Sequence, residues 1–165
     1  KEITAAVTKV ECKGFWLTRT DFMWGKQLKH GDVGQVKLVR LSRKGAGHWT
    51  GLVHETWQIE GQVCSLTAPL LHYPHPTMTA FLRQINHYST LRAHELRAAG
   101  VTANLGQIIF YPVFKFKYLY LVKLGWLDGT AGFVHAMTMA FYTFLTRSKL
   151  WLLAKGIDED KWVSG

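Results

Sequence analysis

The chain has 165 residues, enough for one domain with a real core but too few for two full domains. Its 20 Lys and Arg residues outnumber 11 Asp and Glu residues, and the formal charge of +9 favours acidic partners such as nucleic acid, anionic lipid or phosphorylated glycans. Cys12 and Cys64, the only cysteines, exclude a disulfide framework and a paired-cysteine zinc site, so we expect two reduced, buried thiols in a cytosolic setting.

The first part of the chain predicts a short helix, a strand and a long connection. Residues 2–10 fit the end of an amphipathic helix, and residues 15–18 favour a strand. The stretch from 20 to 35 is polar and basic, and long loops in compact domains are usually functional. Within it, Phe22, Met23 and Trp24 are expected to be exposed, with the alternative that Trp24 folds back onto the core.

The next stretch, residues 36–55, favours a hairpin that ends at an acidic residue. Residues 36–41 favour a strand, Gly45 and Gly47 favour a turn, and residues 49–53 favour the return strand. His54 and Glu55 follow directly. This pair is either the solvated end of a hairpin or part of an active site, because a carboxylate near apolar groups can remove a proton from a hydroxyl.

A second β region and a helix are predicted after this pair. Residues 57–71 alternate between apolar and polar positions, which predicts short antiparallel strands with a hairpin turn at Glu60 and Gly61. Two prolines hold residues 72–76 extended. Thr77 or Thr79 then caps a predicted helix that runs to Ala99.

The last third is aromatic, apolar and basic. Residues 107–124 carry three lysines, and residues 130–145 are almost uncharged. We expect amphipathic helices that lie in the plane of a membrane surface. The alternatives are a helical hairpin packed on the protein's own sheet and a re-entrant or spanning pair, since residues 129–146 approach the length of about 20 residues that a span needs.

An ordered set of motifs covers residues 1–153. They are Gly14-Phe15 with Arg19, Trp24-Gly25, Lys29-His30-Gly31, the run from Arg40 to Gly45, Trp49-x-Gly51-x-Val53-His54-Glu55, Leu70-Leu71-His72-Tyr73 and Leu127-Asp128-Gly129-x-x-Gly132. This set resembles the second half of family 2 glycosyltransferases of the lipopolysaccharide-core glucosyltransferase type. The resemblance implies an α/β fold, α+β in this portion, with a short mixed or antiparallel sheet followed by amphipathic helices. By this resemblance the chain would be the C-terminal part of a glycosyltransferase A-type nucleotide-sugar fold.

The resemblance also implies a division of the chain. Residues 1–100 would form the acceptor-side half of the catalytic domain, residues 101–155 a membrane-associating helical hairpin, and residues 156–165 a polar tail. The family holds a divalent cation, Mg²⁺ or Mn²⁺, with an Asp-x-Asp motif in its first half. This sequence has no such motif before Val36 and begins at Lys1, so we expect a C-terminal fragment that is inactive alone.

The resemblance assigns catalytic roles to three residues. In inverting transfer, one carboxylate removes the proton of the acceptor hydroxyl while the nucleoside diphosphate leaves from the opposite side. By resemblance Glu55 is the expected base, and His54 would position it or contact the donor diphosphate. Asp32 is the second choice for the base.

Further residues are candidates for substrate binding. Arg40, Arg43 and Lys44 would clamp a diphosphate or an anionic acceptor, or else form the solvated face of a hairpin. Aromatic residues are expected to stack on sugar rings. His72 would bind a metal ion or a phosphate oxygen, or else it is a structural histidine at the end of a strand. The substrate-binding set is Arg40, Arg43, Lys44, Trp24, Trp49, His72 and Tyr73.

The resemblance therefore implies an inverting glycosyltransferase that passes a hexose from a nucleotide sugar, expected to be UDP-linked, to a lipopolysaccharide-core or other lipid-linked glycan. Peripheral binding to anionic lipid at the cytoplasmic face of the bacterial inner membrane is expected. A non-catalytic peripheral membrane-binding module is the alternative. Specific nucleic-acid binding is not expected, because the basic residues are dispersed among apolar runs.

Overall fold

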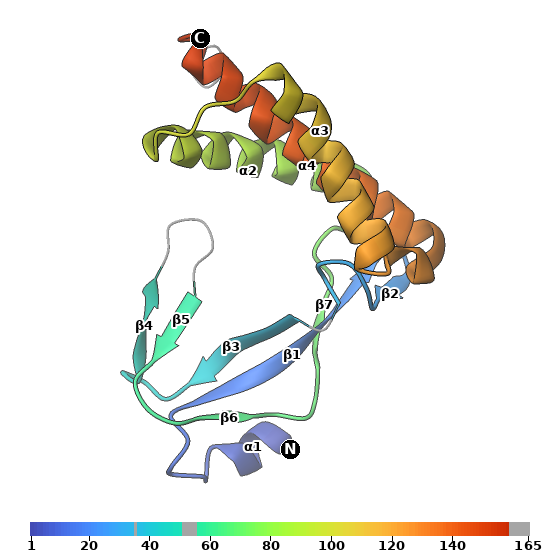
Figure 1. Cartoon of the computed structure of the whole chain (residues 1–165). Coiled ribbons are helices and arrows are strands. Elements are labelled where there is room, and N and C mark those ends of the chain that lie inside the picture. The colour runs from blue at the N-terminus through green and yellow to red at the C-terminus, as the bar shows by residue number, and fades with distance from the viewer. Residues whose placement is uncertain (35, 51–55, 159–165) are drawn as a thin grey trace. The chain divides into compact units, whose positions relative to one another are not determined.

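The computed structural model describes residues 1–34, 36–50 and 56–158, and they form two compact units, Lys1–Pro74 and His75–Gly165 (Figure 1). Strands make up most of the first unit and helices make up the second. The predicted α+β class is confirmed. The predicted functional division after residue 100 stays a prediction, and the helix before that position belongs to the second compact unit.

The first unit is built around one long strand, β1 (Gly14–Met23). The strands β2 (Lys26–Leu28) and β3 (Val36–Ser42) pair with it antiparallel. Two short strands, β6 (Val63–Ser65) and β7 (Leu70–His72), pair with it in parallel. The sheet is therefore mixed, as the resemblance implied.

The predicted loop over residues 20–35 is wrong over its first half. β1 runs to Met23 and turns into β2 at Trp24 and Gly25, whose φ angles are 51° and 74°. Positive φ at both central residues defines the two-residue turn that matches the twist of paired strands. Because it lies in a strand, Met23 is 3% exposed rather than open to solvent.

The two predicted hairpins are also wrong. β4 (Gly47–Thr50) pairs with β5 (Thr56–Ile59) in a second sheet, whereas the strands before and after them pair with β1. A Cβ atom at Gly47 would lie 1.9 Å from the carbonyl oxygen of Gln58, so glycine permits this close pairing. Pairing between distant segments overrides the local turn signals that Gly45 and Gly61 gave.

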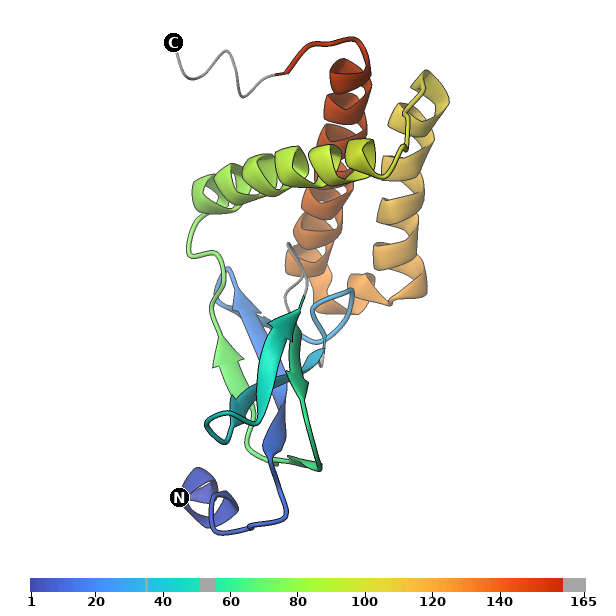
Figure 2. The same ribbon diagram turned by 90° about the vertical axis from the view of Figure 1, so that its left-hand side faces the viewer.

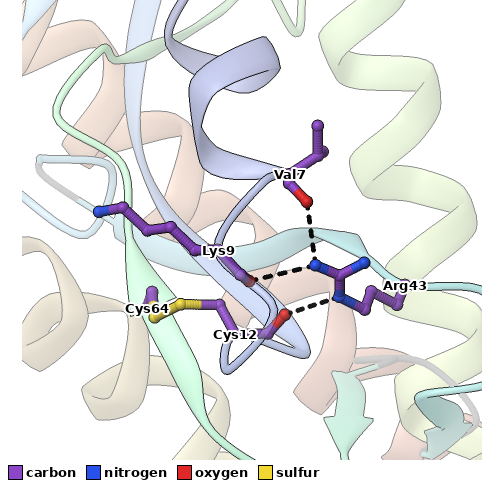
Figure 3. Close-up of a disulfide and its surroundings, with 5 residues drawn as sticks. All are labelled: Val7, Lys9, Cys12, Arg43 and Cys64. Atoms are coloured by element: carbon purple, nitrogen blue, oxygen red, sulfur yellow. Dashed lines mark hydrogen bonds between the residues drawn. A yellow bond between two sulfur atoms is a disulfide. The ribbon is translucent and has the colours of Figure 1, made fainter.

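A core cluster of the first unit contains Ala6 of α1 (Glu2–Ala6) together with Cys12, Phe15, Leu17 and Leu66. A disulfide joins Cys12 to Cys64, with the Cα atoms 5.8 Å apart (Figure 3). The expectation of two reduced thiols is wrong. The parallel pairing of β6 with β1 brings Cys64 beside the start of β1, and no local pattern in the sequence indicates that pairing.

The second unit consists of helices that pack on one another. α2 (Met78–Ala98) begins at the predicted cap, where Thr77 Oγ1 accepts a hydrogen bond from the Ala80 amide at 3.1 Å. It is followed by α3 (Leu105–Lys117), the short helical segments η1 (Tyr118–Val122) and η2 (Gly125–Asp128), and α4 (Gly129–Ala154). α4 packs against both α2 and α3 (Figure 2).

A buried lysine joins α4 to α2. Lys149 is 6% exposed, and its Nζ donates to the Asn86 carbonyl and side-chain oxygens at 2.8 Å each and to Thr90 Oγ1 at 2.7 Å. These bonds supply oxygen partners to an ammonium group that would be costly to bury without them. None of the helices in the described ranges is both long and apolar enough to cross a bilayer.

Candidate functional site

A cluster of charged and polar side chains occupies one end of the large sheet. Asp21 has no exposed side-chain surface, and its Oδ2 accepts a hydrogen bond from Arg19 Nε at 3.0 Å. Its Oδ1 lies 2.5 Å from Nδ1 of His72. Both carboxylate oxygens thus have a partner, which is what a buried carboxylate requires. We call Arg19, Asp21 and His72 the Asp21 cluster.

The strand register places these three residues together. Arg19 and Asp21 are two positions apart in β1, so their side chains point to the same face. Parallel pairing puts His72 of β7 directly beside Asp21. Unlike Asp21, the His72 side chain is 41% exposed. The cluster therefore connects a buried carboxylate to an accessible imidazole.

Two aromatic residues continue the same pair of strands. The rings of Phe22 and Tyr73 stack with centroids 5.2 Å apart and planes 22° from parallel. Tyr73 is 66% exposed, so one of its faces is accessible for stacking, as its predicted substrate role requires. Trp24, in the turn that follows, is partly buried rather than fully exposed.

A second cluster lies on the β4–β5 hairpin. Trp49 is half exposed and packs edge-on against Trp57 with ring centroids 5.0 Å apart, and the Arg40 guanidinium carbon lies 5.1 Å from the Trp49 ring centroid. Arg40 and Trp49, two of the predicted substrate-binding residues, are thus brought together. The indole nitrogen of Trp57 is buried and has no hydrogen-bond partner among the residues that the structure describes.

The predicted catalytic pair, His54 and Glu55, lies outside the described residues. The described strands reach Thr50 and Thr56 on either side of it, and these two threonines pair across the hairpin. Asp32, the second choice for the base, is an exposed residue between β2 and β3. The catalytic assignments therefore stay predictions.

Arg43 has a structural set of contacts (Figure 3). Its Nε donates to the Cys12 carbonyl at 3.0 Å, and its Nη2 donates to the carbonyls of Val7 and Lys9 at 2.9 and 3.1 Å. These bonds fix the loop after α1 against the end of β3. Because Nε and Nη2 are committed to the backbone, phosphate binding by Arg43 would have to use Nη1. The neighbouring Lys44 is exposed.

No cation site is formed by the described residues alone. Across residues 1–34, 36–50 and 56–158, no three His, Cys, Asp or Glu side chains come together as metal ligands would. The Asp21 cluster contributes only one imidazole and a carboxylate whose oxygens are already engaged. The metal-binding role of His72 stays a prediction.

Sequence reasoning missed Asp21 and Trp57 as functional candidates. The signal for Asp21 was present, because the alternating positions Phe15, Leu17 and Met23 of β1 are buried and Asp21 falls in the same phase. A carboxylate on the apolar phase of a strand requires a partner. Because the predicted strand ended at residue 18, its alternation was not followed as far as Asp21.

Comparison with known proteins supports the resemblance inferred from the motifs. Over 144 residues the chain is 33% identical to the lipopolysaccharide core biosynthesis glycosyltransferase LpsC of Rhizobium meliloti (strain 1021). The match covers 86% of this chain and 53% of LpsC, so the chain spans about half the length of that relative. No protein-family model matches the chain. No solved structure matches it.

Proposed function

This chain is related to lipopolysaccharide core glycosyltransferases of the LpsC type, and we propose on that premise that it forms the acceptor-side part of a glycosyltransferase. The enzyme transfers a hexose from a nucleotide sugar, UDP-linked, to a lipopolysaccharide-core or other lipid-linked glycan. The observation that carries this proposal is the 33% identity extending over 86% of the chain. The mixed sheet followed by helices agrees with part of such a fold.

The proposed reaction inverts the configuration at the anomeric carbon. The acceptor oxygen bonds to that carbon, the bond from the carbon to the donor phosphate oxygen breaks, and Glu55 takes the hydroxyl proton as the nucleoside diphosphate leaves. A divalent cation would neutralise charge on the diphosphate. We propose that its ligands lie mostly in the part of an LpsC-like enzyme outside the match, which covers 53% of LpsC.

The described strands support contacts to the sugar and its phosphates. Trp49 offers an exposed indole in β4, whose last residue is Thr50, and Arg40 lies against it. Lys44 is exposed and adds positive charge to the loop before β4. We propose that Trp49 stacks on a sugar ring and that Arg40 and Lys44 attract an anionic substrate.

The base is tested by replacing Glu55 with Gln in the complete enzyme. We expect loss of hexose transfer from UDP-glucose to core oligosaccharide, with an unchanged midpoint of thermal unfolding. Glu60→Gln is a matched control, because Glu60 is an exposed carboxylate on the same hairpin with only a 3.7 Å contact to His48. Near-normal transfer by Glu55→Gln would move the role to Asp32 or to another group.

A second proposed function, peripheral membrane binding, rests on the surface of the helical unit. α3 has no buried residue, although it is mostly apolar. Its exposed apolar side chains and those of α4 are a set that we call the apolar face: Leu105, Ile109, Phe110, Val113, Phe114, Phe133, Met137, Phe141, Phe144 and Trp151. An apolar surface of this extent on a folded unit is typical of a membrane or protein interface.

Basic side chains accompany the apolar face. The Arg147 guanidinium lies 4.4 Å from the Tyr111 ring centroid, and the Lys123 ammonium lies 5.7 Å from that of Tyr118. Aromatic rings with neighbouring cations suit the headgroup level of an anionic bilayer. We propose that α3 and α4 lie in the plane of the membrane surface, at the cytoplasmic face of the bacterial inner membrane.

Vesicle flotation tests the membrane proposal. We expect the chain to float with vesicles that contain phosphatidylglycerol, and to float more weakly as the salt concentration is raised. The double variant Phe110→Ser with Phe114→Ser should not float. Leu82→Ser with Leu91→Ser is the matched control, since it removes two exposed apolar side chains from α2. Equal flotation by both double variants, or none by the wild type, would contradict the proposal.

The Cys12–Cys64 disulfide bears directly on the proposed location. Disulfides are uncommon in the reducing cytoplasm and persist in oxidising compartments. Trapping the thiols with a maleimide in acid-quenched cells would show which form is present. Fully reduced thiols, in a protein that protease added outside the inner membrane does not cleave, would support the cytoplasmic face. A persistent disulfide would argue for the opposite side of the membrane.

A further inference from the structure

We propose that the groove between α3 and α4 binds one acyl chain of an anionic membrane phospholipid, with the end of the chain toward Phe116 and the headgroup phosphate beside Arg147. The inference rests on the proposed membrane association of the helical unit and adds a specific lipid site to it. α3 and α4 lie side by side (Figure 1). The groove between them has a volume of about 400 Å³, and every side chain that lines it is apolar.

A small side chain gives the groove its depth. Ala140 is 5% exposed, and it lies between two larger lining side chains of α4, Met137 and Phe144, each about one turn away. A flat apolar face is sufficient for a helix that lies on a bilayer. A concave groove needs an occupant of its own, because its apolar walls offer water no hydrogen bonds.

Packed aromatic rings form one end of the groove. Phe116, a lining residue near the end of α3, meets Phe133 of α4 edge-on with ring centroids 5.6 Å apart. Tyr120 stacks on Phe116 at 5.3 Å and meets Phe133 edge-on at 5.6 Å. The carbon-rich wall made by these three rings suits the terminal part of an acyl chain rather than a charged headgroup.

A cation marks the other end of the groove. The Arg147 guanidinium of α4 lies 4.4 Å from the ring centroid of Tyr111 in α3. Phe144 and Ile108, each three residues before one member of this pair, both line the groove. Residues three apart share a helix face, so the pair lies at the end of the groove. A guanidinium can contact a ring with its face and a phosphate with its N–H groups.

The charge of these helices selects an anionic ligand. The one acidic residue in the sequence from 105 to 154, Asp128, is 4% exposed. The same stretch carries the cationic residues Lys115, Lys117, Lys123, Arg147 and Lys149. A phospholipid combines a phosphate that complements this charge with a chain that complements the apolar walls. An apolar helix of a partner protein would match the walls but not the charge.

The size of the groove suits one acyl chain. A methylene group occupies about as much space as a water molecule, about 30 Å³, so the groove holds about a dozen carbons of a chain. Each buried methylene strengthens binding until the groove is full. The affinity should therefore depend on chain length up to a definite limit, which an open apolar surface would not impose.

Soluble single-chain lipids test the groove without a bilayer. Octanoyl, lauroyl and palmitoyl lysophosphatidylglycerol, each below its critical micelle concentration, are titrated calorimetrically into the complete enzyme. We expect a single binding site, with affinity that rises about two- to fourfold per methylene from octanoyl to lauroyl and little from lauroyl to palmitoyl. An equally steep rise from lauroyl to palmitoyl, or no binding of any of the three, overturns the proposal.

Filling the groove separates this site from general membrane association. Ala140→Phe places a ring on the groove floor, and Met137→Trp enlarges a side chain that is 48% exposed and so has room to grow. Each should weaken binding of the lauroyl lipid about tenfold, yet still float with phosphatidylglycerol vesicles. Ala98→Phe, at the exposed end of α2, is the control and should bind as the wild type does. Undiminished binding by a folded Met137→Trp protein overturns the proposal.

Two charge variants test the direction in which the lipid lies. Arg147→Gln should weaken binding of lauroyl lysophosphatidylglycerol about three- to tenfold, the size of one charged contact that is open to solvent. Binding of dodecyl maltoside, which has a chain of the same length but no charge, should not change. Lys117→Gln, an exposed position beside Phe116 at the other end of the groove, should affect neither lipid. Equal losses in the two variants contradict the proposed orientation.

The outcomes separate the lipid site from the membrane proposal on which it rests. If the wild type binds the soluble lipid but does not float with vesicles, membrane association fails and the groove site stands. Flotation without binding of the soluble lipid refutes the groove site alone. A dimer that Met137→Trp dissociates, and that the lauroyl lipid does not, would assign the groove to a second copy of the chain and overturn the proposal.

Discussion

Cys12 and Cys64 are bonded across 52 positions of sequence, and this bond ties the segment two residues before β1 to the parallel strand β6. Cys12 is fully buried in the core cluster, and its carbonyl accepts a hydrogen bond from Arg43. The disulfide thus joins the points where the N-terminal loop, the central strand and an edge strand meet. Its removal should affect the whole first unit.

Replacing both cysteines with serine should lower the free energy of unfolding by about 2–4 kcal/mol, because the closed loop is long and its entropy in the unfolded chain is restored. Chemical denaturation followed by circular dichroism gives the value. Wild-type protein in excess reductant should match the double variant, which itself should not respond to reductant. Identical denaturation curves for oxidised and reduced wild type would contradict this account.

Lys149→Met should destabilise the contact between α2 and α4. The side chain keeps its length but loses three hydrogen bonds from Nζ to Asn86 and Thr90, leaving their oxygens in a partly buried site. We expect a loss of about 1–3 kcal/mol in the free energy of unfolding of the helical unit. Lys155→Met, at an exposed position after α4, should change it little. Equal effects of the two variants would show that the buried bonds are not stabilising.

Helix signals in the sequence were local, and they predicted the structure well. Thr77 caps α2 as expected, and Gly100, where φ is +75°, follows its end. Such signals depend on a few neighbouring residues, so one sequence suffices to read them. The strand pairings depended on distant segments. Nothing near residues 61–72 indicates that they pair with β1, and the two predicted hairpins were wrong for that reason.

The candidate site divides in the same way. The motifs that include Arg40, Trp49 and His72 supplied candidate residues whose roles stay predictions, and the structure brings Arg40 against Trp49. The pairing of Asp21 with His72 needed the register of β7 against β1, which sequence patterning does not provide. The disulfide needed the register of β6. Candidate residues could thus be named from local motifs, whereas their contacts with distant strands could not.

Gly132→Ala should disrupt the start of α4. A Cβ atom at Gly132 would lie 1.9 Å from the carbonyl oxygen of Gly125, so the segment before α4 would have to move away. We expect a lower midpoint of thermal unfolding, with a loss of about 1–3 kcal/mol. At Gly106 in α3 a Cβ atom would meet the Asn104 side-chain oxygen at 3.3 Å and Phe110 Cδ2 at 4.0 Å, so Gly106→Ala should have a small effect. An unchanged midpoint for Gly132→Ala would mean that the Gly125 segment adapts easily.

Glu2 should make the stability of the first unit depend on acid pH. Its carboxylate accepts hydrogen bonds from the Thr67 amide and hydroxyl at 2.7 Å each and from the Ala68 amide at 2.8 Å. These bonds, the Thr67 amide first, hold the pKa of Glu2 below its ordinary value of 4.5. Because the folded-state pKa is lowered, the stabilisation is complete above pH 4.5 and is lost as pH falls through the folded-state value.

Denaturation curves measured at a series of pH values below 6 will show this loss in the wild type. Glu2→Gln keeps the shape of the side chain but has no carboxylate to titrate, so its stability should fall less steeply over the same interval. Glu11→Gln, an exposed carboxylate in the same unit, is the control and should follow the wild type. If Glu2→Gln and the wild type lose stability in parallel below pH 4.5, the Thr67 and Ala68 bonds do not link this carboxylate to folding.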